Sequence, residues 1–373
     1  MVVTAPRAAR GGGGAYTGTR GSDGTDPTRR VVSERRCRDS CMHRHDTSHR
    51  AAIGANLPDA MGMPRIAIVG SGLVGRAWAI VFARAGCEVA VYDTAPGVAA
   101  DALAPIRDGL EELARHGLAD DPAGAAARVR AAAGLGDALD GVAYVQESVP
   151  EVLDAKRAIF RELDALAPPD AILASSASAL VASLFTEELA GRARCLVAHP
   201  VNPPHLVPLV ELCGAPWTAP ETVERARELL TAVGQVPIVV RGEIDGFILN
   251  RLQGALLAEA FRLVADGWVS PRDLDRTVSD GLGLRWSFLG PFATAELNAP
   301  GGVADYLARY GALYAGLNAE PAGAAAFDEA TIARVVEAWG AAPARGSVAE
   351  RSQWRDRRLA ALIAHKRSQP PAP

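Results

Sequence analysis

The stretch Ile66-Ala67-Ile68-Val69-Gly70-Ser71-Gly72-Leu73-Val74-Gly75 decides the fold of this 373-residue chain. Its four apolar residues predict a short buried strand, and three glycines follow with the spacing GxGxxG. Residues 78–85 then have the pattern of an amphipathic helix, which Gly86 ends. Residues 89–93 predict a second strand, with the carboxylate of Asp93 at its end. Strand, glycine turn, helix and strand form a βαβ unit, so we predict an α/β fold that begins with a Rossmann-type domain.

The three glycines have the spacing that dinucleotide binding requires. Gly70 permits a tight turn, Gly72 lets the backbone approach a pyrophosphate, and Gly75 lets helix and strand pack closely. Asp93 lies 23 residues after Gly70, about where a carboxylate binds the ribose hydroxyls, and no arginine follows it to bind a 2′-phosphate. The pattern therefore favours NAD over NADP. The expected cofactor-binding residues of this unit are Gly70, Gly72, Leu73, Val74, Gly75 and Asp93.

Composition indicates a globular protein with a small-molecule partner. Hydrophobic residues make up 49% of the chain, which is enough for a sizeable core in two domains. The net charge of -4, without a long basic run in the globular part, argues against binding to nucleic acid or a membrane surface. Uncharged runs such as residues 171–185 are shorter than the about 18 residues that a membrane helix needs. The N-terminus lacks a signal-peptide core, so we expect a cytoplasmic protein.

The first 62 residues differ in composition from the rest of the chain. They contain a glycine run at 11–14, many arginines and no apolar periodicity, so they are predicted to be a disordered extension. Met61 or Met63 directly precedes the first predicted strand. We therefore hypothesise that translation starts there and that the extension is a mispredicted start.

Cysteines and histidines give no sign of a metal site or of disulfides. The five cysteines form an odd count without paired spacing, so no disulfide is expected. Candidate metal ligands gather in the N-terminal extension, at Cys37, Cys41, His43, His45 and His49. Their spacing matches no standard zinc module and no second half-site follows, so we expect no metal.

Strand and helix patterns alternate as far as a boundary near residues 241–246, and the chain is helical beyond it. The predicted strands lie at 142–146, 171–174, 195–199, 209–212 and 236–240, and the predicted helices at 99–115, 151–167, 219–233, 247–265 and 350–366. Pro105 is expected to bend or delay the first of these helices. The Ala- and Gly-rich stretch up to Gly141 is expected to form short helices and loops. Another helix is expected to start with Ser270 as its N-cap and Pro271 in its first turn.

These patterns divide the chain into four parts. The predicted parts are a disordered extension at 1–62, an NAD-binding Rossmann domain at 63–244, an all-α domain at 245–345, and a C-terminal helix and tail at 346–373.

A histidine and a glutamate lie in neighbouring apolar runs of the predicted Rossmann domain. His199 ends the run 195–199, and Glu211 lies inside the run 209–212, with a proline-rich turn between them. This layout places an imidazole and a carboxylate side by side on neighbouring strands. The pair is either a catalytic base with its orienting acid or a buried ion pair that joins two strands. A histidine suits the base of an alcohol oxidation, because its ordinary pKa of about 6.5 lies near working pH.

Lys156 is unusual because nearly all positive charges of this chain are arginines. It follows Glu151 by five residues at the start of a predicted helix, and Lys366 is the other lysine. One interpretation is a solvated helix end. The other is a compact ammonium near a cofactor or substrate, since arginine would serve equally well at a solvated position.

From residue 64 onward the chain resembles the L-3-hydroxyacyl-CoA dehydrogenase superfamily, and within it the lambda-crystallin branch, whose enzymatic activity is L-gulonate 3-dehydrogenase. The resemblance covers everything except the N-terminal extension. It rests on separated motifs in the same order, at residues 70–75 with Arg76 and Trp78, 146–151, 175–180, 198–204, 208–211, 246–253, 281–286 and 290–291.

The resemblance implies a catalytic set and a cleft. His199 matches the family's catalytic base, and Glu211 matches the carboxylate that orients it. Ser178 matches the serine that hydrogen-bonds the reacting oxygen, and Asn250 the asparagine that helps to hold it. The cleft positions are Glu151 and Lys156 for the cofactor and Asn202 for the substrate. A homodimer through the helical domain is also implied.

The substrate is the least determined part of the resemblance. Arg285 and Trp286 resemble the branch that acts on small hydroxy acids, and a guanidinium can bind a free carboxylate through two hydrogen bonds. Arg285 is therefore a candidate substrate residue, against the alternative of a surface or interdomain arginine. His205 departs from the branch, which has tyrosine there, at the expected pocket rim.

Four functions follow as expectations. The first is NAD-dependent oxidation of a small L-3-hydroxy acid, with L-gulonate as the best candidate. The alternatives are an L-3-hydroxyacyl-CoA such as 3-hydroxybutyryl-CoA, L-carnitine, and a non-catalytic NAD-binding role of the crystallin kind.

Overall fold

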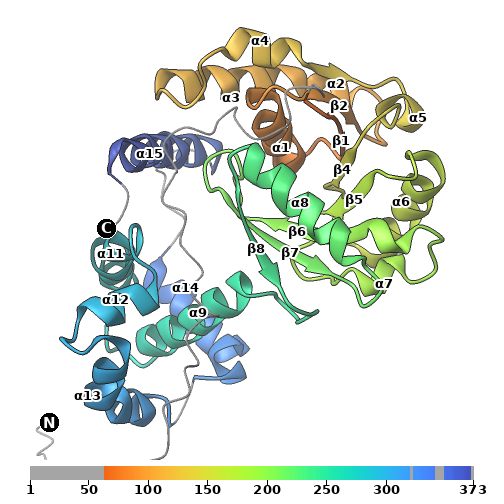
Figure 1. Ribbon diagram of the computed structural model, residues 1–373. Helices are drawn as coiled ribbons and strands as arrows, with labels where there is room; N and C mark the ends of the chain where they lie inside the picture. Colours follow the sequence, from red (N-terminus) through yellow and green to blue (C-terminus); the bar gives the residue numbers. More distant parts are fainter. Residues whose placement is uncertain (1–62, 320–321, 341–347, 371–373) are drawn as a thin grey trace, which may run out of the picture. The chain divides into compact units, whose positions relative to one another are not determined.

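A sheet of eight strands forms the first part of the chain in the computed structural model, which describes residues 63–319, 322–340 and 348–370 (Figure 1). The strand order is β3-β2-β1-β4-β5-β6-β7-β8. The strands are β1 (Arg65–Val69), β2 (Glu88–Tyr92), β3 (Val129–Ala131), β4 (Tyr144–Glu147), β5 (Ile172–Ser175), β6 (Cys195–Pro200), β7 (Leu209–Gly214) and β8 (Val236–Val240). The pairs are parallel except for β6 and β7, which are antiparallel. Strands β2 and β3 are added on one side of β1, and β4 and its successors are added on the other side. A doubly wound sheet binds its ligand at this switch point between β1 and β4.

The predicted βαβ unit is confirmed as β1, α1 (Leu73–Arg84) and β2. Four of the five β1 residues are buried, as expected for a parallel strand with helices on both faces. Helix α1 begins after Gly72 and is followed by Gly86 at φ +98°, a left-handed conformation that favours glycine. Trp78 and Phe82 of α1 are fully buried against the sheet.

Alternate residues of each strand pack on opposite faces of the sheet. Ile66 and Ile68 belong to one hydrophobic cluster, and Ala67 and Val69 belong to the other. Helices α1, α3 (Leu103–Arg115) and α8 (Pro220–Ala232) cover the first face, and α6 (Leu153–Leu166) and α7 (Ser183–Thr186) cover the second (Figure 1). The core of the fold therefore consists of two apolar layers around one sheet.

Pro105 interrupts the helix expected at 99–115, in line with the prediction that it would bend or delay this helix. The segment forms α2 (Val98–Asp101) and α3, because Pro105 has no N–H to donate to the carbonyl group four residues earlier. The stretch expected to hold short helices and loops contains α4 (Pro122–Ala127), α5 (Leu135–Ala138) and also the edge strand β3. That strand is only three residues long, which is too short for an apolar alternation to reveal it.

A series of helices follows β8, as predicted. They are α9 (Leu249–Ala265), α10 (Pro271–Arg276), α11 (Gly283–Trp286), α12 (Pro291–Leu297), α13 (Gly302–Leu317) and α14 (Glu329–Trp339), with a π-helical turn at Thr277–Leu282 and a 3-10 turn at Ala324–Phe327. The predicted N-cap is confirmed, because the Ser270 hydroxyl accepts a hydrogen bond from the N–H of Asp273. No described helix is long and apolar enough to cross a membrane.

The last helix, α15 (Val348–Ser368), packs on the Rossmann domain. Ala360 is 1% exposed and belongs to the same hydrophobic cluster as Ile66, and Leu359 and Ile363 pack against that cluster. The predicted C-terminal segment is therefore tied to the sheet and is not a free appendage. The predictions for residues 1–62, including the start site and the candidate metal ligands, lie outside the described residues.

Candidate active site

Two adjoining cavities lie at the switch point of the strand order, between the ends of β1 and β4. The larger has a volume of about 680 Å³, and the smaller about 420 Å³. Val74, Ser148 and Val149 line both. The larger cavity brings together the predicted cofactor residues Gly70, Gly72, Leu73 and Asp93. The smaller cavity brings together His199, Ser178, Asn250, Asn202, Glu151 and Lys156.

The glycine turn fits a dinucleotide. A Cβ atom on Gly70 would lie 2.7 Å from the backbone carbonyl of Ser148, and one on Gly75 would lie 1.8 Å from the carbonyl oxygen of Gly70. The protein's own packing therefore requires both glycines. A Cβ on Gly72 would meet no protein atom within 4 Å, and Gly72 lines the larger cavity. This open space above the N-terminus of α1 is where a pyrophosphate could approach the backbone.

Asp93 follows β2 and is held by the glycine turn itself. Its Oδ2 atom accepts hydrogen bonds from the backbone N–H and the hydroxyl of Ser71, both at 2.8 Å, and its Oδ1 atom accepts one from the N–H of Ala95 at 3.1 Å. Partial burial raises the pKa of Asp93, but these hydrogen bonds outweigh burial and hold that pKa below its ordinary value. The carboxylate is thus ionised at the edge of the larger cavity. The role of Ser71 was not predicted.

His199 and Glu211 face each other across the antiparallel pair β6 and β7, as predicted. The Nδ1 atom of His199 lies 2.8 Å from Oε2 of Glu211, and both side chains are buried. The other carboxylate oxygen, Oε1, accepts hydrogen bonds from the N–H groups of Ile248 and Leu249, at 2.8 and 3.0 Å. Glu211 therefore holds both the imidazole and the first turn of α9. Since Nδ1 is engaged, Nε2 is the ring nitrogen that remains for a ligand.

Phe247 supports the imidazole from one side and was not predicted. Its ring centroid lies 5.5 Å from that of His199, and its side chain is fully buried. The backbone of Phe247 has φ +48°, in the left-handed region that a bulky residue rarely adopts, and Gly246 before it has φ +75°. Two consecutive left-handed residues turn the chain from β8 into α9. The sequence shows only a Gly-Phe pair, which carries no signal of this conformation.

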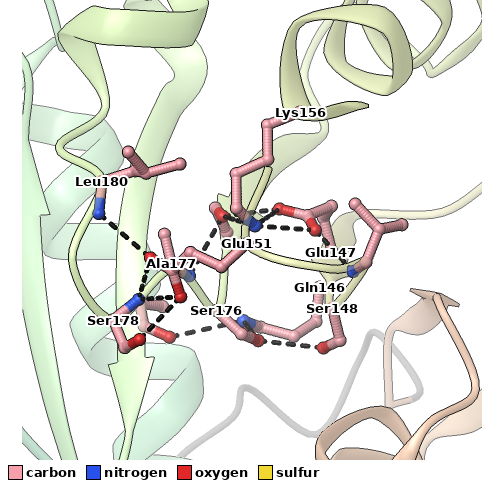
Figure 2. A network of polar contacts seen from close by, with 12 residues as sticks. Gln146, Glu147, Ser148, Glu151, Lys156, Ser176, Ala177, Ser178 and Leu180 are labelled. Carbon is pink, nitrogen blue, oxygen red and sulfur yellow. Dashed lines mark hydrogen bonds and ion pairs between the residues drawn. The ribbon is translucent and has the colours of Figure 1, made fainter. Parts of the chain in front are cut away.

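Ser178 and Glu151 are joined in a dense network (Figure 2). The Glu151 carboxylate accepts hydrogen bonds from the Ser178 hydroxyl at 2.6 Å and from the N–H groups of Ser178, Ala179 and Leu180 at 2.6 to 3.0 Å. Partial burial raises the pKa of Glu151, but these bonds outweigh it and lower that pKa. Asn250 donates from Nδ2 to the carbonyl oxygen of Ser178 at 2.8 Å. The loop after β5 is thus held from α9 and from the segment before α6.

Lys156 is 1% exposed, so the interpretation of a solvated helix end is wrong. Its Nζ atom lies 3.0 Å from each carboxylate oxygen of Glu147. The side chain lines the smaller cavity, but the buried Glu147 balances its charge. This partner was not predicted.

Two residues expected at the substrate pocket lie elsewhere. Arg285 is exposed on α11, near Tyr306 of α13, and lines neither cavity. His205 also lines neither cavity, and its backbone carbonyl accepts a hydrogen bond from Nη1 of Arg84. Burial lowers the pKa of His205 to about 4. Asn202 is the predicted substrate residue that the structure places at the smaller cavity.

A dinucleotide cradle beside a buried imidazole–carboxylate pair is the arrangement of an NAD-dependent dehydrogenase. Residues 65–244 match the 3-hydroxyacyl-CoA dehydrogenase NAD binding domain, and residues 246–330 match the C-terminal domain of the same family. The chain belongs to the 3-hydroxyacyl-CoA dehydrogenase family, uses NAD and acts on a CH–OH group.

Similar proteins include lambda-crystallin from Oryctolagus cuniculus, 42% identical over 82% of this chain and 97% of that protein. L-carnitine dehydrogenase from Pseudomonas aeruginosa is 38% identical over 80% of this chain and 92% of that protein. Among solved structures, the NAD+-dependent dismutase 5-formyl-3-hydroxy-2-methylpyridine 4-carboxylic acid 5-dehydrogenase has a TM-score of 0.71 at 30% identity. The likeness covers 82% of this chain and 99% of that one.

Proposed function

We propose that this chain oxidises the 3-hydroxyl group of a small L-3-hydroxy acid, and that L-gulonate is its best candidate substrate. The observation that carries the proposal is the fixed imidazole of His199 in one cavity with Ser178 and Asn250. The resemblance to the lambda-crystallin branch favours L-gulonate within the family.

In the proposed reaction His199 is the base. Its Nε2 atom accepts the hydroxyl proton of the substrate, while Glu211 keeps the proton on Nδ1 and stabilises the imidazolium that forms. NAD, when bound, accepts the hydride from the carbinol carbon. General acid–base help of this kind typically contributes about 10² to 10⁴ in rate.

Ser178 and Asn250 position the reacting oxygen in this proposal. The alcohol gives its single proton to His199, so both residues serve as donors to its oxygen. The Ser178 hydroxyl donates to Glu151 in the structure and turns to donate to the reacting oxygen when the substrate binds. Asn250 uses its amide nitrogen to donate to the Ser178 carbonyl, and a second N–H on the same nitrogen remains for the substrate. Both side chains are therefore held at the cavity before a substrate binds.

The proposed cofactor site combines the glycine turn with the smaller cavity. Gly70, Gly72, Leu73, Val74 and Gly75 would face the pyrophosphate, and Asp93 would face the ribose hydroxyls. Glu151 and Lys156 would line the path toward the reacting carbon, because both border the smaller cavity.

The lining of the smaller cavity argues against L-carnitine. A trimethylammonium group favours a cage of aromatic rings. Apart from the His199 imidazole, the described residues around this cavity carry no aromatic side chain. Arg285 lies outside the cavity, so Asn202 remains as the proposed polar contact for the substrate.

NADH formation on a panel of substrates tests the proposal. The panel is L-gulonate, L-carnitine, L-3-hydroxybutyrate and its CoA ester, each with NAD+. We expect the highest kcat/KM with L-gulonate. A preference for the CoA ester would reject the free-acid proposal, and NAD+ binding without turnover on any member would favour a non-catalytic, crystallin-like role.

A further inference from the structure

A second carboxylate lies behind the wall of the smaller cavity. Glu147 is the last residue of β4, and its side chain is fully buried. Figure 2 shows it beside Lys156. It accepts hydrogen bonds from Lys156 Nζ at 3.0 Å to each oxygen, from the Ser175 hydroxyl at 2.5 Å and from the N–H of Val149 at 2.6 Å. Glu147 does not line either cavity, so it cannot itself touch a cofactor or substrate there.

Glu147 connects three elements that meet at the cavity. Lys156 comes from α6, Ser175 ends β5, and Val149 follows β4. Lys156 Nζ also lies 3.3 Å from the Ser175 hydroxyl oxygen, and that oxygen accepts a hydrogen bond from the N–H of Ala177. Ala177 directly precedes Ser178. One buried carboxylate thus fixes the ammonium of a cavity-lining lysine and the beginning of the loop that carries Ser178.

Stability alone gives a weak reason for this arrangement. A buried ion pair is often no more stable than two apolar side chains of the same volume, because both charges lose their hydration. Burial raises the pKa of Glu147, and the neighbouring Lys156 ammonium counteracts this rise. Arginine occupies nearly all the remaining basic positions of the chain. At position 156, the compact ammonium of lysine fits between two carboxylate oxygens and a hydroxyl.

We infer that Glu147 is a positioning residue, which acts through Lys156 and Ser175 to hold the ammonium and the Ser178 loop at the cofactor cavity. This inference rests on the proposed function of the cavity. The three N–H groups of the Lys156 ammonium are directed to Glu147 and Ser175, so Lys156 acts on a cofactor through its positive charge, which must stay at the cavity wall to do so. Without the Glu147 carboxylate, the ammonium would lose two of its hydrogen bonds and the loop would lose its anchor at Ser175.

The test compares Glu147→Gln, Lys156→Met and the double variant. We measure the Kd for NAD+ by calorimetry and the melting temperature of each. Each single variant should melt at a lower temperature, because it leaves one buried charge without its partner. The double variant removes both charges and should melt near the wild-type temperature. Its Kd for NAD+ should nevertheless be at least about tenfold higher than that of the wild type, which corresponds to a loss of about 1.4 kcal/mol in binding free energy.

The double variant keeps the inference falsifiable even if a single variant fails to fold. A double variant with both wild-type stability and wild-type NAD+ affinity would show that the pair is only structural and would overturn the inference. Lys366→Met, at the other lysine of the chain, is the matched control and should leave the Kd unchanged. A wild-type protein that binds NAD+ but oxidises no hydroxy acid would reject the proposed function while leaving this comparison intact.

Nuclear magnetic resonance gives an independent readout. Lys156 and Lys366 are the lysines of the chain, so selective 15N labelling of lysine gives one ammonium signal for each, and Lys366→Met assigns them. The Lys156 signal should be protected from exchange in the wild type, because its side chain is 1% exposed and hydrogen-bonded. Glu147→Gln should shift this signal and remove its protection. An unchanged signal would contradict a positioning role for Glu147.

Discussion

Glu151 shows how a single carboxylate can hold the loop that carries Ser178. It accepts hydrogen bonds from three consecutive backbone N–H groups and from the Ser178 hydroxyl. Such a run of N–H groups forms a concave site that prefers an anion. The hydroxyl of Ser178 is therefore oriented before any substrate arrives. Glu151 was predicted to line the cleft, but its hydrogen bonds to Ser178 are known only from the structure.

Glu151→Gln should loosen the Ser178 loop and make the protein less sensitive to acid. The folded-state pKa of Glu151 lies below the ordinary value of 4.5, so its stabilisation is complete above that pH and is lost as pH falls through the folded value. The difference in free energy of unfolding between wild type and variant, measured in urea, should therefore be largest near neutral pH and shrink below pH 4.5.

Glu187→Gln, at an exposed glutamate, is the matched control and should change the free energy of unfolding by less than about 0.5 kcal/mol. A Glu151→Gln variant as stable as the wild type at neutral pH would show that the loop does not depend on this carboxylate.

The residues of the proposed active site and those that support them differ in how far the sequence could predict them. His199 and Glu211 were predictable from two apolar runs, because antiparallel register pairs them directly. Ser178 and Asn250 were placed by family resemblance. Phe247 and Glu147 were not predicted, since a left-handed φ and a contact across 28 residues to Ser175 leave no local pattern.

The turn between β1 and α1 requires glycine at two positions for two different reasons. Gly75 has a protein atom where its Cβ would lie, whereas Gly72 faces open space. The structure thus separates glycines that folding needs from a glycine that only a ligand needs. The GxGxxG spacing predicted this difference between Gly72 and Gly75, and the structure supplies the contacts behind it.

Gly72→Ala should fold normally but bind NAD+ at least about tenfold more weakly, because the added methyl group would occupy the space above the helix N-terminus. Its φ of -65° suits alanine, so the melting temperature should not change. Calorimetry and thermal unfolding measure both quantities. Gly75→Ala is the contrasting variant and should lose about 1–3 kcal/mol or more of stability, since its Cβ would lie 1.8 Å from the Gly70 oxygen. Equal NAD+ affinity in Gly72→Ala and wild type would contradict the proposed pyrophosphate position.

The helices beyond β8 were predicted as an all-α domain, and the structure shows a series of helices there. Their N-cap and boundaries follow local signals such as Ser270 and Pro271. The docking of α15 on the Rossmann core places Ala360 in the hydrophobic cluster that also contains Ile66, and local periodicity cannot show such a relation between distant parts of the chain.

At the scale of the whole molecule, the helical domain exposes much apolar surface. Trp268 is 75% exposed, Phe292 80% and Leu297 72%, and few of the domain's described side chains are buried. Exposed apolar surface of this kind usually marks an interface. We propose that the protein is a homodimer and that the helical domain at 245–345 forms its interface. In the same proposal, residues 63–244 are the Rossmann domain and residues 346–373 are a separate C-terminal segment.

If the helical domain forms the dimer interface, a charged substitution on its surface should weaken the dimer. The wild type should sediment as a dimer, and Phe292→Lys should shift it toward monomers, because a lysine in an apolar interface loses its hydration. Leu166→Lys, at a 53% exposed leucine that ends α6, is the control and should remain a dimer. A monomeric wild type at micromolar concentration would reject the proposal.

We propose that His199 is the base of an NAD-dependent oxidation and not merely half of a structural ion pair. The most direct test is NADH formation from L-gulonate by His199→Gln, together with its Kd for NAD+. We predict that the Kd stays within about twofold of the wild type while kcat falls by about 10² to 10⁴. A His199→Gln variant that turns over at nearly the wild-type rate would contradict the claim.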